Sequence, residues 1–393
     1  MHLLALLALP LTAPTNDWPQ WRGPDRDGIS RETEWRSEGR PAWDRRVGLG
    51  YSAVSVVGDR LYTAGWDEED EKDVVWCLDA TTGDVVWEHR YPAKKWDKYH
   101  GGGTQSTPSV AGENVFVLNR EGRFLRLDSE TGDARWSRNV AEEHDLELPT
   151  WGFSASPLVL EDTVVLNVGP VLACDRGNGK VLWRSERDYG HAYSTPVDAK
   201  LAGQDVLVVL GGAGLAVLER DGGRELGFYE WKTKYDINAG TPVIVGDDRI
   251  LISSGYGHGA AMVRFTGDAI ETLWETKALR SQMATTMLVD GHFYGLDDKV
   301  LKCFDLDGEE KWSARSIGLG ALSAAGDRLL VVTGEGELVV AKANPEEFEE
   351  LSRVDLVDGG VCWTMPVLAN GRVYVRNSHG HLVCRDHRPP TDQ

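Results

Sequence analysis

The sequence predicts an all-β fold: a single eight-bladed β-propeller, closed by pairing of an N-terminal strand with the last C-terminal blade. Three observations predict it: a unit that recurs about every 45 residues, a turn-and-tryptophan motif inside the unit, and a proline-containing start to it. The 393 residues include 44 Gly and 15 Trp. This composition, with many short apolar runs, is typical of all-β chains with frequent tight turns.

The turn-and-tryptophan motif fixes the outer hairpin of each unit. Its last Gly lies four residues before a Trp in four segments: Gly83 before Trp87, Gly132 before Trp136, Gly179 before Trp183, and Gly308 before Trp312. Each Gly follows an Asp that favours a turn, and Gly accepts the positive φ that a hairpin needs. The motif therefore predicts a β-hairpin with a Trp at a fixed place on its outgoing strand. Units four and seven are degenerate, and unit four has Phe228-Tyr229 where a Trp is expected.

The start of each unit is marked by Ser or Thr followed by Pro and alternating apolar residues. The marker occurs at residues 107–108, 156–157, 195–196 and 241–242, with Met365-Pro366 as a variant. Degenerate starts lie at Ser52, Thr285 and Ser323. Pro lacks a ladder donor and is accepted on an edge strand. The innermost strand of a propeller blade is such an edge, so eight starts predict eight blades.

The last unit lacks its outer strand. Strands are predicted at residues 372–376 and 381–385, and the sequence given stops at Gln393 without a fourth. Gly39 and Trp43 show the same four-residue spacing ahead of unit one. We therefore predict that residues 40–47 form the outer strand of the final blade, which removes an exposed seam. The expected division is a signal peptide (1–16), an N-terminal arm with the closing strand (17–48), the propeller (49–388) and a tail (389–393).

The repeated tryptophans are interpreted as packing residues rather than sugar-binding platforms. One indole recurs per blade on the same strand, which favours docking between neighbouring blades. The residues assigned to blade docking are Trp43, Trp87, Trp136, Trp183, Trp274 and Trp312.

The cysteines are interpreted in the same way, as buried core residues. Cys77, Cys174, Cys303 and Cys384 each fall on the third strand of a different blade, so they cannot pair with one another. Whether Cys362 pairs with Cys384 stays open. An odd count without a CxxC motif argues against a zinc site.

Residues 3–9 form a short apolar run followed by Pro10, which is typical of a signal peptide. The alternatives are a mis-assigned start or a buried N-terminal strand. We expect an exported, periplasmic or extracellular monomer. No stretch is long enough to span a bilayer, and a net charge of −20 argues against a nucleic-acid partner.

The turn-and-tryptophan units resemble the quinoprotein-type, or PQQ-like, β-propeller repeat of quinoprotein alcohol dehydrogenases and of BamB-like assembly proteins. Residues 18–28, 151–157, 255–261 and 362–377 resemble a group of bacterial PQQ-binding-like propeller proteins. The resemblance implies the eight-bladed fold over residues 18–386. Because the repeat is a structural element, it implies no single activity.

A quinoprotein dehydrogenase would imply PQQ held with Ca²⁺. Those enzymes carry adjacent cysteines beside the cofactor, a Glu, Asn and Asp set for Ca²⁺, and an Asp base. This chain has no Cys-Cys pair, and no such set can be mapped on it. No catalytic, cofactor-binding or metal-ligating residue is therefore assigned, and no cofactor is predicted.

The remaining candidates lie on the loops that lead into the innermost strands. Repeat proteins place variable insertions on their binding face, and rigid scaffolds carry functional residues on loops. The candidate rim consists of His100, Gln105, Trp151, Tyr193, Asn238, Arg280, Gln282 and Trp363. Ordinary loop packing is the alternative for each of them.

The sequence thus favours a non-enzymatic, BamB-like envelope propeller. Its loop face would bind or scaffold a protein or polysaccharide partner, which the sequence does not name. The alternative is a PQQ-dependent, quinoprotein dehydrogenase-like oxidoreductase.

Overall fold

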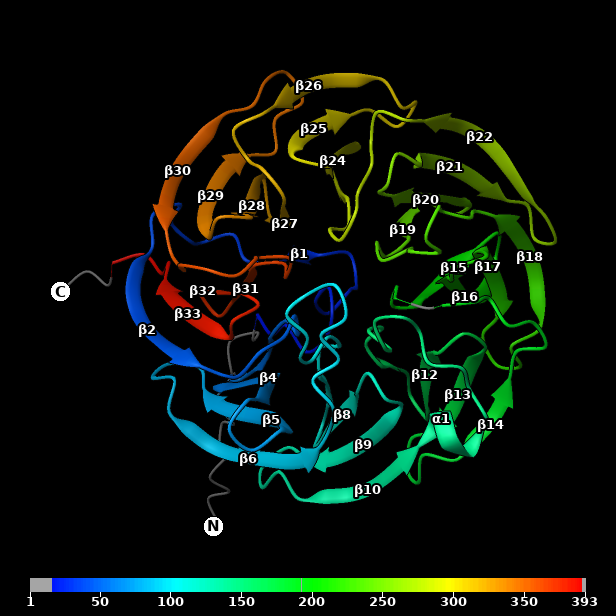
Figure 1. Ribbon diagram of the computed structural model, residues 1–393. Coiled ribbons are helices and arrows are strands. Elements are labelled where there is room, and N and C mark those ends of the chain that lie inside the picture. Colours follow the sequence, from blue (N-terminus) through cyan, green and yellow to red (C-terminus); the bar gives the residue numbers. More distant parts are fainter. Residues whose placement is uncertain (1–15, 192, 391–393) are drawn as a thin grey trace, which may run out of the picture.

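The computed structural model describes residues 16–191 and 193–390, and the predicted propeller is confirmed there. Eight sheets surround a central axis, with the chain passing from sheet to sheet around the ring (Figure 1). One short helix, α1 (Val140–Glu143), interrupts an otherwise all-β succession of strands. The predicted signal peptide lies almost wholly outside the described residues. In the part of the chain that is described, no helix is long and apolar enough to cross a membrane.

Every blade contains four antiparallel strands, and in blades 1 to 7 these four run from the axis outward in chain order. Blade 1 consists of β3 (Ser55–Val57), β4 (Arg60–Asp67), β5 (Lys72–Asp79) and β6 (Val85–Pro92), and blade 2 of β7 (Ser109–Ala111), β8 (Asn114–Leu118), β9 (Arg123–Asp128) and β10 (Ala134–Asn139). Blade 3 consists of β11 (Leu158–Val159), β12 (Thr163–Asn167), β13 (Val171–Asp175) and β14 (Val181–Arg184), and blade 4 of β15 (Val197–Leu201), β16 (Gln204–Leu210), β17 (Gly214–Glu219) and β18 (Glu225–Glu230).

The second half repeats this plan, and blades 7 and 8 each receive a strand from the N-terminal region. Blade 5 consists of β19 (Val243–Val245), β20 (Arg249–Ser254), β21 (Gly259–Phe265) and β22 (Ile270–Thr276), and blade 6 of β23 (Met287–Val289), β24 (His292–Asp297), β25 (Val300–Phe304) and β26 (Glu310–Ala314). Blade 7 consists of β1 (Ile29–Ser30), β27 (Gly320–Ala325), β28 (Arg328–Thr333), β29 (Glu337–Lys342) and β30 (Glu350–Asp355). Blade 8 consists of β31 (Val367–Ala369), β32 (Arg372–Arg376), β33 (His381–Asp386) and β2 (Arg40–Arg46). The units that are degenerate in sequence, four and seven, are complete blades.

The ring closes as predicted. Strand β2 lies antiparallel to β33, and Trp43 stands opposite Cys384 in that pairing. The outer strand of blade 8 therefore comes from the start of the chain and the other three come from its end, so the two terminal regions lie side by side (Figure 1).

The Ser/Thr-Pro marker lies just before the innermost strand, at the edge of its sheet. Its hydroxyl links neighbouring blades: the backbone N–H of Ala53 donates to Thr107 Oγ1 at 3.0 Å, and the N–H of Thr107 donates to Ser156 Oγ at 2.9 Å. The N–H of Ser156 in turn donates to Thr195 Oγ1 at 3.0 Å. A hydroxyl is thus needed because it accepts a bond from the preceding blade.

Two of the degenerate starts need correction. The hydrogen bond of Ala53 to Thr107 makes Ala53, and not Ser52, the equivalent position in blade 1. In blade 7 the innermost strand begins at Gly320, three residues before the predicted start at Ser323. Blade 7 has no marker proline, and its inner edge instead pairs in parallel with β1.

The repeated tryptophans contact the turn between the two outer strands of the next blade. Five of the six lie against a turn glycine, whereas Trp312 donates to the carbonyl of Asn344 in the blade 7 turn, which has no glycine. The indole of Trp87 donates to the carbonyl of Ser129 at 2.9 Å, and a Cβ on Gly132 would lie 2.6 Å from the same ring. Trp43 makes the equivalent contacts with Ala80 and Gly83, at 3.1 Å and 2.7 Å. The turn glycine is therefore required twice, for its positive φ and for the space that the indole fills.

All five cysteines are free and buried. Cys77, Cys174, Cys303 and Cys384 lie on the third strands of blades 1, 3, 6 and 8, as predicted. Cys362 lies in the connection before β31 and is not bonded to Cys384, which answers the question that the sequence left open.

An N-terminal arm, residues 16–32, crosses the end of the axis that lies opposite the inter-blade connections. It contacts every blade on the innermost strand, just before it, or on the turn that follows it. The contacts are Trp18 with Val56, Pro19 with Val110, Arg26 with Val159 and electrostatically with Asp198, Trp21 with Thr241, Gly28 with Met287, β1 with β27, and Glu32 with Gly371. The propeller axis is thus occupied by the protein's own chain.

Candidate functional site

A pocket of about 350 Å³ opens on the face that carries the inter-blade connections. Every such connection contributes to it except residues 315–319, and the N-terminal arm contributes one indole. The lining residues are Trp21, Tyr51, Tyr99, His100, Gln105, Trp151, Ser154, Ser156, Tyr193, Thr195, Ile237, Ala239, Tyr256, Gln282, Met283 and Trp363. The volume lies within the range of roughly 300–1,000 Å³ that is usual for small-molecule sites.

Six of the eight candidate rim residues line this pocket: His100, Gln105, Trp151, Tyr193, Gln282 and Trp363. The other two are not among the lining residues. Asn238 is fully buried behind the wall, where its Nδ2 donates to the carbonyls of Gly211 at 2.8 Å and Trp231 at 3.0 Å. Arg280 is paired with Asp297 at 2.5 Å and with Asp298 at 3.2 Å.

A positional rule that was not drawn from the sequence accounts for much of the wall. The residue two positions before the unit start lines the pocket in seven blades: Tyr51, Gln105, Ser154, Tyr193, Ala239, Met283 and Trp363. With the first start predicted at Ser52, one residue too early, the position two before it is Gly50, so the sequence does not indicate Tyr51. Trp21 and Tyr256 follow no such rule, since one belongs to the arm and the other to the turn between β20 and β21.

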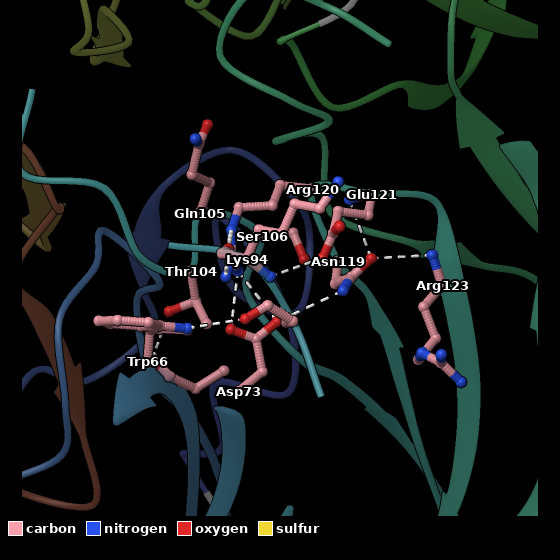
Figure 2. A network of polar contacts seen from close by, with 12 residues as sticks. Trp66, Asp73, Lys94, Thr104, Gln105, Ser106, Asn119, Arg120, Glu121 and Arg123 are labelled. Carbon is pink, nitrogen blue, oxygen red and sulfur yellow. Dashed lines mark hydrogen bonds and ion pairs between the residues drawn. The ribbon is translucent and has the colours of Figure 1, made fainter. Parts of the chain in front are cut away.

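A buried ion pair holds the two longest connections in place. Arg120 Nη1 lies 2.7 Å from one carboxylate oxygen of Asp73 and 2.9 Å from the other, and both side chains are fully shielded from solvent. The same guanidinium donates from Nε to the carbonyl of Lys94 at 2.6 Å, and the Arg120 carbonyl accepts from the N–H of Phe153 at 3.0 Å. Figure 2 shows this network, with Gln105 pointing away from it. The pair thus anchors the connections that carry His100, Gln105 and Trp151.

The same two connections are joined directly. The indole of Trp96 donates to the carbonyl of Thr150 at 3.0 Å, and the Gln105 amide nitrogen donates to the carbonyl of Trp151 at 2.5 Å. Within residues 16–191 and 193–390 no group donates to the Gln105 amide oxygen, so it can accept a hydrogen bond from a ligand.

A buried arginine bonds to the backbone of the connection that carries Tyr51. Arg376 on β32 is 1% exposed and donates to the carbonyls of Gly48 at 3.0 Å and Gly50 at 3.2 Å. Burial lowers the pKa of Arg376 to about 10, so its charge persists at neutral pH. The guanidinium therefore fixes the backbone of the connection on which Tyr51 lies.

Aromatic rings pack against one another around the pocket. Tyr51 and Trp363 are stacked, with ring centroids 5.2 Å apart and an interplanar angle of 17°. Trp151 and Tyr193 meet edge to face at 5.9 Å, and Tyr99 lies 6.2 Å from Trp151. Tyr99 is 80% exposed, so it extends the aromatic wall toward solvent.

His100 adds a polar group of defined direction. Its Nδ1 accepts the backbone N–H of Gly102 at 2.9 Å, and its ring lies edge-on to Tyr51 at 5.4 Å. Burial lowers the pKa of His100 below the usual value. The imidazole is therefore neutral at neutral pH, with its proton on Nε2 as a donor.

Trp21 marks the inner end of the pocket. Its indole donates to Thr241 Oγ1 at 3.0 Å. On the other side of this ring, Gln20, Arg22 and Arg26 line a cavity of only about 10 Å³, room for roughly one water molecule. The arm therefore converts the propeller channel into a pocket with one entrance.

The lining contains no Asp, Glu, Lys or Arg, although 26% of the chain is charged. Nor do the described ranges, 16–191 and 193–390, contain a group of three His, Cys, Asp or Glu residues placed to hold a metal ion. The pocket can therefore offer ring faces, amides, hydroxyls and one neutral imidazole.

The chain matches a known protein family over most of its length. The family model described as outer membrane protein assembly factor BamB matches residues 30–186, 71–307 and 297–388, which is most of the chain. A curated relative, the quinohemoprotein alcohol dehydrogenase ADH-IIG of Pseudomonas putida, is 27% identical over 176 residues. That match covers 41% of this chain but only 22% of the dehydrogenase.

Solved structures of both kinds share the fold. BamB from Moraxella catarrhalis has a TM-score of 0.67 and 16% identity, with 89% of this chain and 100% of that chain covered. The quinohemoprotein alcohol dehydrogenase from Comamonas testosteroni has a TM-score of 0.74 and 14% identity, with 97% and 82% covered. At these identities the likeness shows the fold alone. On the family match, the chain belongs to the PQQ-like β-propeller family whose model bears the description of the outer membrane protein assembly factor BamB.

Proposed function

We propose that this protein is a non-enzymatic, BamB-like propeller of the cell envelope that binds or scaffolds a protein or polysaccharide partner through the face carrying the pocket. The observation that carries the proposal is the makeup of the pocket: an aromatic, uncharged site with one entrance, built from seven inter-blade connections. A rigid ring that gathers its variable loops around one concave site is suited to recognition. Export, which the apolar run of residues 3–9 supports, and a monomeric state belong to the same proposal.

The alternative, a PQQ-dependent dehydrogenase, is favoured by the match to ADH-IIG. The residues present do not fit the cofactor. PQQ carries three carboxylates, and no Lys or Arg lines the pocket to neutralise them. Ca²⁺ wants several converging oxygens, and no carboxylate lines the pocket either. Burying such charges without partners costs several kcal/mol for each.

The six repeated tryptophans belong to the scaffold in this proposal. Their contacts with the next blade's turn support a docking role, and none of the six lines the pocket. Recognition is then left to the aromatic residues of the loops.

Calorimetric titration of the intact protein with PQQ in the presence of Ca²⁺ tests the choice between binding protein and dehydrogenase. The proposal predicts no saturable heat and no rise in melting temperature. Tight binding of the quinone, together with dye reduction in the presence of an alcohol, would overturn it.

A further inference from the structure

The pocket presents flat apolar surfaces beside sparse polar groups. The stacked pair Tyr51 and Trp363 and the edge-to-face pair Trp151 and Tyr193 are its largest aromatic elements. Aromatic side chains supply rigid contact area at little conformational cost. A ligand that fits must therefore have a flat or gently curved apolar face.

The polar groups suit a ligand with hydroxyls. His100 offers its Nε2 proton, and Gln105 offers its amide oxygen, since its amide nitrogen is the atom that donates to the carbonyl of Trp151. The Gln282 side-chain amide has no hydrogen-bond partner among the described residues, so it can both donate and accept. Hydroxyl groups, which also donate and accept, match this set.

The absence of charged side chains from the pocket lining narrows the class of ligand further. A uronate, a phosphorylated sugar or the charged end of a peptide would place an ion against a wall that holds no counter-ion. The acidic surface of the chain, with its net charge of −20, adds repulsion for anions. Neutral ligands avoid both costs.

The closed inner end of the pocket limits how a polymer chain could enter it. Because Trp21 and the arm fill the axis, a chain cannot thread through the ring. Only a terminus can enter, while the units behind it lie along the rim, where Tyr99 is exposed next to Trp151.

We infer that the pocket binds the end of a neutral polysaccharide, with a terminal sugar ring packed against the aromatic walls and its hydroxyls bonded to His100, Gln105 and Gln282. This inference rests on the proposed function and selects the polysaccharide among its partner classes. The ring C–H face of a neutral sugar is apolar and its edge carries hydroxyls, which is the pattern that the pocket offers.

The test is calorimetric titration of the full chain with linear neutral oligosaccharides: maltohexaose, cellohexaose and chitohexaose, with an oligogalacturonate as the charged comparison. At least one neutral chain is expected to bind, with tenfold or greater preference over the oligogalacturonate. The stoichiometry is expected to stay at one protein per chain when longer chains of the same series are used, since only one end enters.

Variants locate the site. Trp363→Ala is expected to weaken binding tenfold or more, and Tyr99→Ala, at the rim, to weaken it less. Leu182→Ala, an exposed apolar residue on the outer strand β14, is the matched control and is expected to bind as the wild type does. Melting curves establish that each variant is folded.

The inference is overturned if no neutral oligosaccharide binds, if Trp363→Ala binds as the wild type does, or if several proteins bind along one chain. A protein partner captured by the same face, without any sugar binding, would overturn this inference alone. Binding of PQQ with Ca²⁺ would instead overturn the proposed function.

Discussion

Arg120 and Asp73 form an ion pair, fully buried between blades 1 and 2, in which the single nitrogen Nη1 lies 2.7 and 2.9 Å from the two carboxylate oxygens. The pair lies behind the pocket, and neither of its side chains lines it. Its guanidinium instead bonds to the connection that carries His100 and Gln105, and its backbone bonds to the connection that carries Trp151. The shape of the pocket thus depends on a charge pair outside it.

Removing one partner of this pair leaves the other charge buried and alone. Arg120→Met is expected to lower the free energy of unfolding by about 3–5 kcal/mol, and Asp73→Asn should also be destabilising. The double variant is expected to be more stable than Arg120→Met, because no unpaired charge remains. Denaturant unfolding of the three variants checks this. If Arg120→Met unfolds at the wild-type midpoint, the pair has no anchoring role.

The contact of Trp87 with the next blade should also be measurable. Trp87→Ala removes a ring that is 7% exposed and packed on Gly132, so a loss of roughly 3–5 kcal/mol is expected. Trp87→Phe loses the hydrogen bond to Ser129 but keeps most of the apolar area, so it should lose less than the alanine variant. Thermal unfolding of the pair separates packing from hydrogen bonding. Equal losses would show that the blade contact is not chiefly one of packing.

Glu32 gives stability a specific pH dependence. Burial raises the pKa of Glu32 to about 7, and the N–H of Gly371, 2.8 Å away, offsets this only in part. An unfolded Glu titrates near 4.3. Between these values the folded protein binds more protons, so this group makes stability fall as pH rises from about 4.3 to 7.

Glu32→Gln mimics the protonated acid and removes this dependence. The difference in melting temperature between the variant and the wild type is expected to grow in favour of the variant across that window, and to be constant below it. A difference that does not change with pH would contradict the raised pKa.

Two N-terminal deletions separate the arm from the closing strand. Loss of residues 1–48 removes β2 and leaves β33 with an open edge, so a collapse of stability is expected. Loss of residues 1–38 keeps β2 and removes the arm, so the ring should persist with a smaller loss and with the inner end of the pocket opened. The melting temperatures of the two deletion variants are compared with that of the full chain. An unchanged melting temperature for the longer deletion would refute closure by β2.

Repetition made the fold predictable. Four Gly-to-Trp spacings and five proline markers recur at one period, and the same spacing at Gly39 and Trp43 located the closing strand. The predicted starts of blades 1 and 7 are wrong because neither blade has the marker proline, and no local pattern marks the pairing of blade 7 with β1.

The pocket was predictable only in part. Gln105, Tyr193 and Trp363 stand at fixed positions before strand starts, so the repeat brings them to one place. The contribution of Trp21 depends on an arm that crosses the axis, and nothing in its sequence specifies that path. Asn238 also lies close to a strand start, but its amide nitrogen donates to the carbonyls of Gly211 and Trp231, and the side chain does not line the pocket.

The central claim, that recognition occurs at the pocket face, is tested most directly by affinity capture from an envelope extract with three immobilised proteins. These are the wild type, Trp363→Arg, which places a charge in the pocket, and Thr81→Arg, which places the same charge on an exposed turn at the opposite face. The account predicts that the wild type and Thr81→Arg retain the same partner and that Trp363→Arg, folded by its melting curve, loses it. Equal retention by all three would contradict the claim.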